Sequence, residues 1–191
     1  MAKVNIKIEG VSYQVEENLT ILEAAKACGY EIPSLCAFNH GECSNGSCRV
    51  CLVEVAGARG LVASCVNPVS EGMDIRISTP KATEARRASV ELLLSNHNQN
   101  CQQCDKNGQC ELLYVATVTG AREGRYQGVK TPTTLDELTP SIVRDTSKCI
   151  LCGRCVARCE NAHGSGILGF QNRGFKTIVG PAEDRSFANS P

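Results

Sequence analysis

CILCGRCVARC, residues 149–159, has four cysteines in the spacing C-x2-C-x2-C-x3-C. Three thiolates on one tight turn can bind three corners of a [4Fe-4S] cluster, and the fourth cysteine of such a run binds the neighbouring cluster in two-cluster ferredoxins. Zinc sites use cysteine pairs separated by a longer spacer, which this run does not provide. The spacing therefore predicts that Cys149, Cys152, Cys155 and Cys159 bind iron–sulfur clusters in a protein that carries electrons.

The composition narrows the class of protein. The chain has 13 cysteines in 191 residues, and an odd count without an apolar signal segment argues against a secreted disulfide framework. We therefore expect reduced thiols and a cytoplasmic location. The 20 basic residues balance the 20 acidic ones, so charge gives no reason to expect nucleic acid as a partner. Proteins are therefore the favoured partners. No apolar stretch reaches the roughly 18 residues of a membrane span.

The first 78 residues predict a β-grasp domain. Apolar and polar residues alternate on either side of Gly10, which is typical of a β-hairpin. Thr20 and Glu23 form a capping-box pattern at the start of a helix, and Gly29 ends that helix. Strands are expected at residues 3–9, 12–16, 50–55, 61–65 and 73–78.

Further segments follow the β-grasp domain. Thr79 is a candidate N-cap with Pro80 at the first helical position, which predicts a helix to about His97, and a shorter helix is expected at 109–118. The Gly-, Thr- and Pro-rich stretch after it predicts a connector, and residues 167–180 predict a hairpin. The expected organisation is a β-grasp domain (1–78), a helical module (79–120), a connector (121–140) and a ferredoxin-type module (141–191).

A set of metal ligands is expected in the first domain. Cys36, Cys48, Cys51 and Cys65 have the spacing C-x11-C-x2-C-x13-C, and small residues between the first two let backbone N–H groups approach the sulfurs of a [2Fe-2S] cluster. Cys43 complicates the assignment, because Cys43-x4-Cys48-x2-Cys51 matches the plant-type ferredoxin spacing equally well. A plant-type site takes its fourth cysteine from a more distant strand, whereas Cys65 lies close. Cys36 is therefore favoured over Cys43.

A second set of metal ligands follows the long helix. His97, Cys101, Cys104 and Cys110 have the spacing H-x3-C-x2-C-x5-C. Alone, His97 would be interpreted as a buried core histidine bonded to a backbone carbonyl. The three cysteines that follow favour a mixed imidazole–thiolate [4Fe-4S] site, whose potential should differ from that of its neighbours because imidazole is neutral. A zinc site with the same three thiolates and one imidazole is the alternative.

Other features receive minor roles. The stretch GSGILG, residues 164–169, matches G-x-G-x-x-G, but it does not follow a strand and too few residues remain for a βαβ unit, so nucleotide binding is not expected. Arg86 and Arg87 are expected on the solvated face of their helix. His40 and His163 are expected in loops, with a low expectation of function.

Four segments together resemble the amino-terminal region of multi-cluster iron–sulfur subunits. They are IPSLC (32–36), GSCRVCLVEVAGARGLVASCVNPV (46–69), LLLSNHNQNCQQCDKNGQCEL (92–112) and SIVRDTSKCILCGRC (141–155). The family includes the [FeFe]-hydrogenase large subunit, the complex I iron–sulfur subunit, the diaphorase iron–sulfur subunit of bidirectional [NiFe]-hydrogenases and the alpha subunit of NAD-linked formate dehydrogenases. The resemblance implies [2Fe-2S] at Cys36, Cys48, Cys51 and Cys65, [4Fe-4S] at His97, Cys101, Cys104 and Cys110, and a further [4Fe-4S] at Cys149, Cys152 and Cys155. Cys43 has no role in that pattern.

One departure from the family concerns the third cluster. In the family a second C-x2-C-x2-C-x3-C run follows, which gives this cluster its fourth thiolate and takes the residue at Cys159 for its own cluster. This chain reaches Pro191 without such a run. We favour the interpretation that the sequence is part of a longer subunit. The alternatives are that Cys159 completes the single cluster or that an outside ligand does so.

The expected protein is an α+β electron-transfer module with one [2Fe-2S] and at least two [4Fe-4S] clusters. It combines a β-grasp ferredoxin-like domain, a small helical module with one histidine and three cysteine ligands, and a partial bacterial-ferredoxin-like module, without a catalytic site. The resemblance implies electron relay between a flavin/NAD-binding subunit and a catalytic centre, with a small [2Fe-2S] subunit as a second partner and ferredoxin as a further candidate. The favoured home is an NAD-linked [FeFe]-hydrogenase, of a kind that can be electron-bifurcating. A diaphorase or formate dehydrogenase subunit is the runner-up, and a zinc-stabilised interaction module is the alternative of another class.

Overall fold

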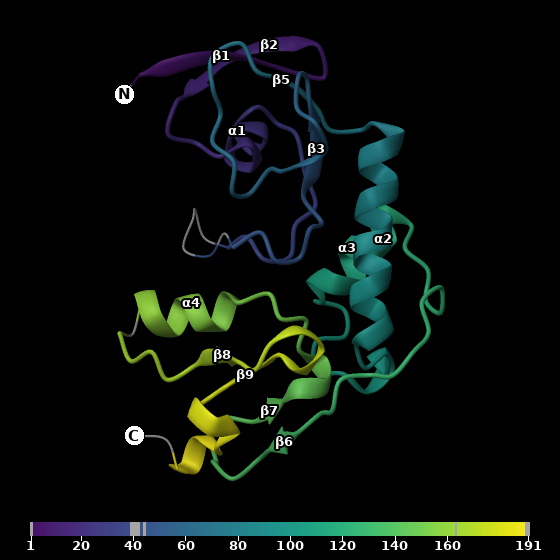
Figure 1. Cartoon of the computed structure of the whole chain (residues 1–191), viewed down its shortest axis with the longest axis vertical. Helices are drawn as coiled ribbons and strands as arrows, with labels where there is room; N and C mark the ends of the chain where they lie inside the picture. The colour runs from purple at the N-terminus through teal and green to yellow at the C-terminus, as the bar shows by residue number, and fades with distance from the viewer. Residues whose placement is uncertain (1, 39–42, 44, 163, 190–191) are drawn as a thin grey trace.

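The computed structural model describes residues 2–38, 43, 45–162 and 164–189, and it combines helices and strands (Figure 1). The strands are β1 (Lys3–Ile8), β2 (Val11–Glu16), β3 (Leu52–Val55), β4 (Val62–Ala63), β5 (Asp74–Arg76), β6 (Leu135–Asp136), β7 (Arg144–Asp145), β8 (Gly169–Gln171) and β9 (Ile178–Gly180). The α-helices are α1 (Ile21–Ala27), α2 (Pro80–Asn96), α3 (Glu111–Thr119) and α4 (Arg154–Asn161). None of the helices in these described ranges is long and apolar enough to cross a membrane.

The first five strands form one sheet in the order β2-β1-β5-β3-β4. The hairpin of β1 and β2 is antiparallel and turns at Glu9-Gly10, where both residues have positive φ. β1 pairs in parallel with β5, and β3 is antiparallel to both β5 and β4. The hairpin and the later strands lie where the sequence predicts them, although β3, β4 and β5 are shorter than expected.

Helix α1 packs its apolar residues into the core of this sheet. Ile21, Ala24 and Ala25 are buried in the same cluster as Ile6 and Ile75 of the sheet. The predicted capping box is present, because the Thr20 hydroxyl accepts a hydrogen bond from Glu23 N and the Glu23 carboxylate accepts one from Thr20 N. The cysteines of the first set belong to this core, so this candidate metal site is part of the domain's interior.

Helix α2 runs from the sheet towards the C-terminal module, with α3 beside it (Figure 1). It begins as predicted, with Thr79 as N-cap and Pro80 in the first turn. The prediction that Arg86 faces solvent is wrong: its residue is only 7% exposed, and its Nε donates a 2.7 Å hydrogen bond to the carbonyl of Leu52 on β3. The neighbouring Arg87 is exposed and donates to the carbonyl of Thr119 at the end of α3.

The segment after α3 is tied to α2 before it reaches the third cysteine set. The buried carboxylate of Glu91 accepts a hydrogen bond from Arg122 N and forms a 2.8 Å ion pair with Arg125. Farther along, β6 pairs antiparallel with β7. Strand β6 therefore lies inside the segment expected to be a connector. The strand that pairs with β6 is β7, which lies after residue 140. The composition of residues 121–140 alone therefore does not predict a strand there.

The C-terminal part contains α4 and the antiparallel pair of β8 and β9. This pair confirms the predicted hairpin over residues 167–180. The two strands are joined by a longer turn than a tight hairpin has, because a 3-10 turn at Gly174–Lys176 lies between them. Asn172 and Gly174 both adopt positive φ, which such a connection requires.

Candidate metal centres

The first cysteine set lies inside the sheet domain. Cys36 comes from the loop after α1, Cys48 and Cys51 from the turn that leads into β3, and Cys65 from the loop after β4. All four side chains are buried, and the Sγ atoms of Cys48 and Cys36 are 3.4 Å apart. The structure therefore brings together four residues that are up to 29 positions apart in the sequence.

The thiols of this set interact directly with one another. Hydrogen bonds from the thiols of Cys48 and then Cys65 lower the pKa of Cys36 to about 2. A hydrogen bond from the Cys65 thiol lowers the pKa of Cys51 to about 6, although burial opposes it. The same hydrogen bonds raise the pKa of the donor thiols, Cys48 and Cys65. Four buried sulfurs that contact one another are the donors that a [2Fe-2S] cluster uses.

Cys43 contacts the third cysteine set, not the four cysteines of the first set. It is buried, and its Sγ is 3.8 Å from the carbonyl oxygen of Cys152 in the third set. Burial raises the pKa of the Cys43 thiol, and the charges of Cys36 and Cys152 raise it further. Cys43 therefore lies between the first and third sets, whereas Cys36 makes sulfur–sulfur contact with the first.

The second set lies around a cavity of about 150 Å³ between the end of α2 and α3. His97, Cys101 and Cys110 line it, with Leu94 and Leu112 among the apolar residues of its wall. The fourth residue, Cys104, ends the short 3-10 turn that begins at Cys101 and is not part of the lining.

His97 carries an atom that suits a metal. Its Nδ1 is buried and has no hydrogen-bond partner among the described residues, unlike a core histidine bonded to a backbone carbonyl. Burial lowers the pKa of His97, Lys130 and Lys148 lower it further, and Asp145 opposes them. The imidazole is thus kept neutral, which is the form that binds metals. The imidazole and the two thiols around the cavity are donors of the kind that a mixed-ligand cluster uses.

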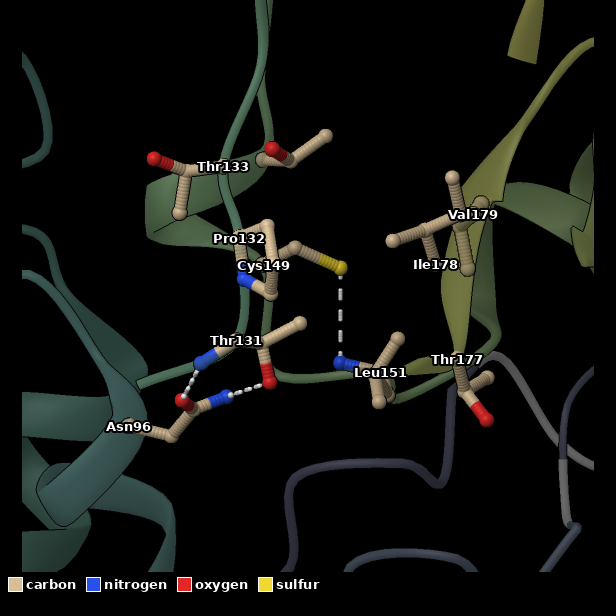
Figure 2. Close-up of a pocket in the computed structure, with 10 residues that line it drawn as sticks. Asn96, Thr131, Pro132, Thr133, Cys149, Leu151, Thr177, Ile178 and Val179 are labelled. Carbon is tan, nitrogen blue, oxygen red and sulfur yellow. Dashed lines mark hydrogen bonds between the residues drawn. The ribbon is translucent and has the colours of Figure 1, made fainter. Parts of the chain in front are cut away.

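The third set is presented on a turn with two left-handed residues. Leu151 and Gly153 have φ of 54° and 78°. In this backbone conformation the N–H of Leu151 donates a hydrogen bond to the Sγ of Cys149 at 3.4 Å (Figure 2). A small cavity of about 20 Å³ adjoins Cys149. Burial raises the pKa of Cys149 and Cys155. Amide hydrogen bonds to sulfur in a tight turn are the environment expected of a cluster ligand.

Cys159 lies on α4, one turn after Cys155. Its Sγ is 3.2 Å from the hydroxyl of Ser165, and this contact lowers the pKa of Cys159, with further contributions from the backbone N–H groups of residues 166–168. The glycine pattern at 164–169 therefore surrounds a sulfur. The sequence pattern correctly argued against a nucleotide site there, but it did not predict that these residues contact the Cys159 sulfur. The short sequence distance between Cys159 and the glycine pattern is the one signal that indicates it.

Arg154, the first residue of α4, links the first and third sets. Its guanidinium donates to the carbonyl of Ala37, next to Cys36, at 3.0 Å and stacks over the Phe38 ring at 5.4 Å. It also forms a 2.5 Å ion pair with Glu111 of α3. One side chain thus contacts all three parts of the chain.

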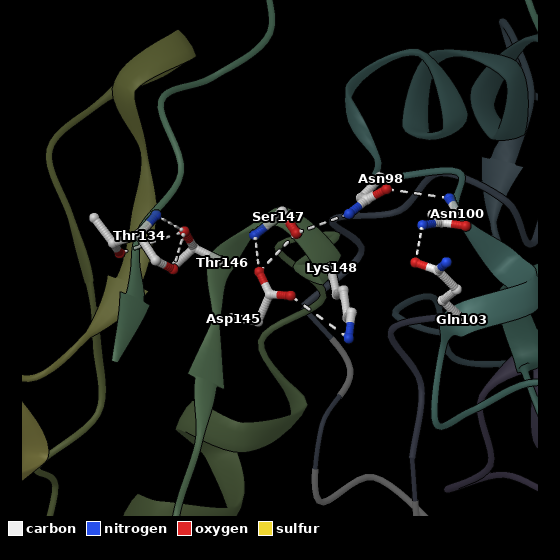
Figure 3. Close-up of polar contacts among 8 residues, drawn as sticks. All are labelled: Asn98, Asn100, Gln103, Thr134, Asp145, Thr146, Ser147 and Lys148. Carbon is white, nitrogen blue, oxygen red and sulfur yellow. Dashed lines mark hydrogen bonds and ion pairs between the residues drawn. The ribbon is translucent and has the colours of Figure 1, made fainter. Parts of the chain in front are cut away.

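The second and third sets are joined by a chain of polar contacts (Figure 3). Asn98, which follows His97, donates its backbone N–H to the carbonyl of Ser147 at 3.0 Å. Ser147 in turn donates both its N–H and its hydroxyl to the carboxylate of Asp145. Lys148 pairs with the same carboxylate at 3.5 Å. The loop after His97 is thereby held against the turn that leads to Cys149.

In the described ranges, no group of three or more His, Cys, Asp or Glu side chains is arranged to hold a single metal ion. This result concerns one-ion sites, whereas the ligands of a cluster bind separate iron atoms. His40 and His163 lie outside the described residues.

Comparison with known proteins defines the class. Residues 1–80 match the family model of a 2Fe-2S iron-sulfur cluster binding domain, and residues 86–125 match that of the NADH-ubiquinone oxidoreductase-G iron-sulfur binding region. The chain is therefore an iron–sulfur protein with both [2Fe-2S] and [4Fe-4S] binding domains.

Curated relatives and a solved structure identify the family. The chain is 40% identical, over its whole length, to an NADP-reducing hydrogenase subunit HndD of Solidesulfovibrio fructosivorans, of which it covers 33%. It is 36% identical, over 92% of its length, to the NADH-ubiquinone oxidoreductase 75 kDa subunit of Reclinomonas americana, of which it covers 25%. A crystal structure of NAD+-reducing [NiFe]-hydrogenase in the H2-reduced state superposes with a TM-score of 0.87 at 30% identity, covering 95% of this chain and 76% of that one.

The chain belongs to the family that comprises the iron–sulfur subunits of NAD(P)-linked hydrogenases and the 75 kDa subunit of complex I. It spans about a third or less of the length of these curated relatives.

Gly153 offers a test of how the first and third sets meet. A Cβ at this position would collide with Asn45 Nδ2 and lie 3.2 Å from the Phe170 ring, in addition to the strain of positive φ. Gly153→Ala should therefore destabilise the protein by about 1 kcal/mol more than Gly57→Ala, which shares the positive φ but has open space around it, because Asn45 can move aside only by losing its hydrogen bond to the Cys152 carbonyl. Chemical denaturation of both variants measures the difference. Equal losses would show that Asn45 does not pack against this turn.

Proposed function

We propose that the chain is an electron-transfer module that relays electrons between a flavin/NAD(H)-binding partner and a catalytic centre elsewhere. The observation that carries this proposal is that the loops of the first and second sets both hydrogen-bond to the turn of the third, through Asn45 and Arg154 on one side and Asn98 on the other. When bound, iron–sulfur clusters supply one-electron carriers. The chain's own part is to hold the three ligand sets close together and to exclude water from the buried sulfurs.

The proposed ligand sets follow the spacing of the sequence. They are Cys36, Cys48, Cys51 and Cys65 for one [2Fe-2S] cluster, His97, Cys101, Cys104 and Cys110 for one [4Fe-4S] cluster, and Cys149, Cys152 and Cys155 for a second [4Fe-4S] cluster. The fourth ligand of the last cluster is Cys159 or a thiolate outside the described residues. The amide groups around Cys159 support its role as a cluster ligand, whether of this cluster or of a further one.

The finer architecture is proposed in the same terms. Residues 1–78 form a β-grasp [2Fe-2S] domain, supported by the parallel pairing of β1 with β5 and by α1 packed on the sheet. Residues 79–120 form the helical module with one histidine and three cysteine ligands. Residues 141–191 form a partial bacterial-ferredoxin-like module. Strand β6, in the connector at 121–140, pairs with β7 of that module.

We favour an NAD-linked [FeFe]-hydrogenase, with or without electron bifurcation, as the home of the module. The proposal is supported by the 40% identity to a subunit of an NADP-reducing hydrogenase. Its partners would be a flavin/NAD-binding subunit and a small [2Fe-2S] subunit in the cytoplasm, with ferredoxin as a further candidate. A diaphorase subunit is the runner-up and is supported by the likeness to the NAD+-reducing [NiFe]-hydrogenase structure. A formate dehydrogenase subunit is a third possibility from sequence resemblance alone.

The relay role is tested with the reconstituted chain by itself. After anaerobic reconstitution, dithionite should reduce the clusters and a one-electron dye should reoxidise them. Gas chromatography should detect no hydrogen, and formate should not reduce the same dye. If the chain evolved hydrogen or oxidised formate, its assignment as a relay without a catalytic site would be wrong.

A further inference from the structure

Arg86 carries a buried positive charge that the proposed relay does not yet use. It extends from α2 towards β3, and its Nε donates to the carbonyl of Leu52 at 2.7 Å. Its Nη2 is buried and has no hydrogen-bond partner within the described ranges. Among the same residues, no carboxylate lies within ion-pair distance of it. The carboxylate of Glu9 instead accepts hydrogen bonds from the backbone of Ile77 and Ser78.

A buried guanidinium without a counter-ion is costly, because burial removes its hydration. Leu52, which accepts its hydrogen bond, directly follows Cys51, and the Cys51 side chain is fully buried. Burial lowers the pKa of Arg86, while the charges of Cys51 and Glu9 raise it. The buried cation is therefore held against the backbone one residue from a buried candidate ligand, so negative charge added at the first cysteine set would stabilise it.

We infer that Arg86 is a positioning residue whose fixed charge raises the reduction potential of the [2Fe-2S] centre at Cys36, Cys48, Cys51 and Cys65. This inference rests on the proposed function, because it requires the cluster to be bound there. Addition of one electron from a low-potential donor makes the centre one unit more negative, and no bond forms or breaks. A nearby buried cation stabilises the reduced form more than the oxidised form, since the interaction grows with the negative charge.

Helix α2 supplies a matched control. Arg87 is the next residue and has the same charge, but it is exposed and its Nε donates to Thr119 on the side of α3. Its charge is screened by water, so its removal should have little effect on the buried sulfurs. Arg86→Lys is the second control, because it keeps the charge and loses the planar fork.

The experiment is an anaerobic redox titration of the reconstituted whole chain, with the [2Fe-2S] signal followed by EPR. Arg86→Gln should lower the equilibrium constant for reduction at least about tenfold, which is ~59 mV for a one-electron couple. Arg86→Lys should stay nearer to the wild type than Arg86→Gln, and Arg87→Gln should not shift the potential. Should Arg86→Gln fail to fold, Arg86→Met keeps the aliphatic stem and is expected to give the same shift.

Three outcomes overturn the inference. In the first, a neutral variant binds the cluster with the wild-type potential. In the second, Arg87→Gln shifts the potential as much as Arg86→Gln does. In the third, the wild-type chain binds no [2Fe-2S] cluster, and this result also overturns the proposed function, whereas the first two leave that function intact.

Discussion

Replacing Cys36 by serine is expected to abolish the [2Fe-2S] centre of the first domain. The Cys36 sulfur is in contact with that of Cys48 and accepts hydrogen bonds from the thiols of Cys48 and Cys65, so it lies at the centre of the buried set. Removing it leaves three buried thiols in the set. Because metal binding supplies part of the folding free energy, the variant should also melt at a lower temperature than the wild type.

Cys43→Ser is the matched control for this prediction. Cys43 is also buried, but its sulfur faces the carbonyl of Cys152 instead of the other sulfurs of the first set. The visible absorption and EPR signals of the [2Fe-2S] centre should persist in Cys43→Ser and disappear in Cys36→Ser. The reverse pattern would assign Cys43 as the ligand, in the plant-type spacing.

The second large effect is expected at His97. In His97→Cys a thiolate takes the place of a neutral imidazole, so the bound cluster becomes more negative by one charge. Its reduction potential should fall by on the order of 100 mV or more, in the direction opposite to the rise seen when histidine replaces cysteine in Rieske centres. His97→Ala, which provides no donor, should lose this cluster. EPR-monitored redox titration measures both results.

Gln99→Ala is the control for the His97 variants. Gln99 lines the same cavity, and its side-chain amide donates to the carbonyl of Leu94, so its removal perturbs the wall without removing a ligand. In Gln99→Ala the [4Fe-4S] cluster should remain bound, with the reduction potential of the wild type. If His97→Ala instead kept a [4Fe-4S] cluster of unchanged potential, the imidazole would not be a ligand.

The sequence predicts those parts of the fold that depend on local chemistry. The β1–β2 hairpin, the capping box of Thr20 and Glu23 and the start of α2 at Thr79-Pro80 all follow from residues within a few positions of one another. The cysteine spacings likewise indicate which sets are candidates. Family comparison supports the two kinds of cluster-binding domain that these spacings predict.

Features that depend on distant residues were not predicted. Arg86 was expected in solvent because a basic pair on a helix is usually hydrated, and only the position of Leu52 on β3 shows that it is buried. The contacts of Arg154 with Ala37 and Glu111 span 117 and 43 positions, which no local pattern encodes. The same is true of the amides around Cys159, since the glycine pattern that supplies them is more familiar from nucleotide sites.

Metal and sulfide analysis of the anaerobically reconstituted chain tests the central claim most directly, when combined with EPR before and after dithionite. Three clusters predict a brown protein with roughly ten iron and ten sulfide ions per chain, together with EPR signals from both kinds of cluster after reduction. A colourless protein that holds stoichiometric zinc and remains EPR-silent in dithionite would contradict the account.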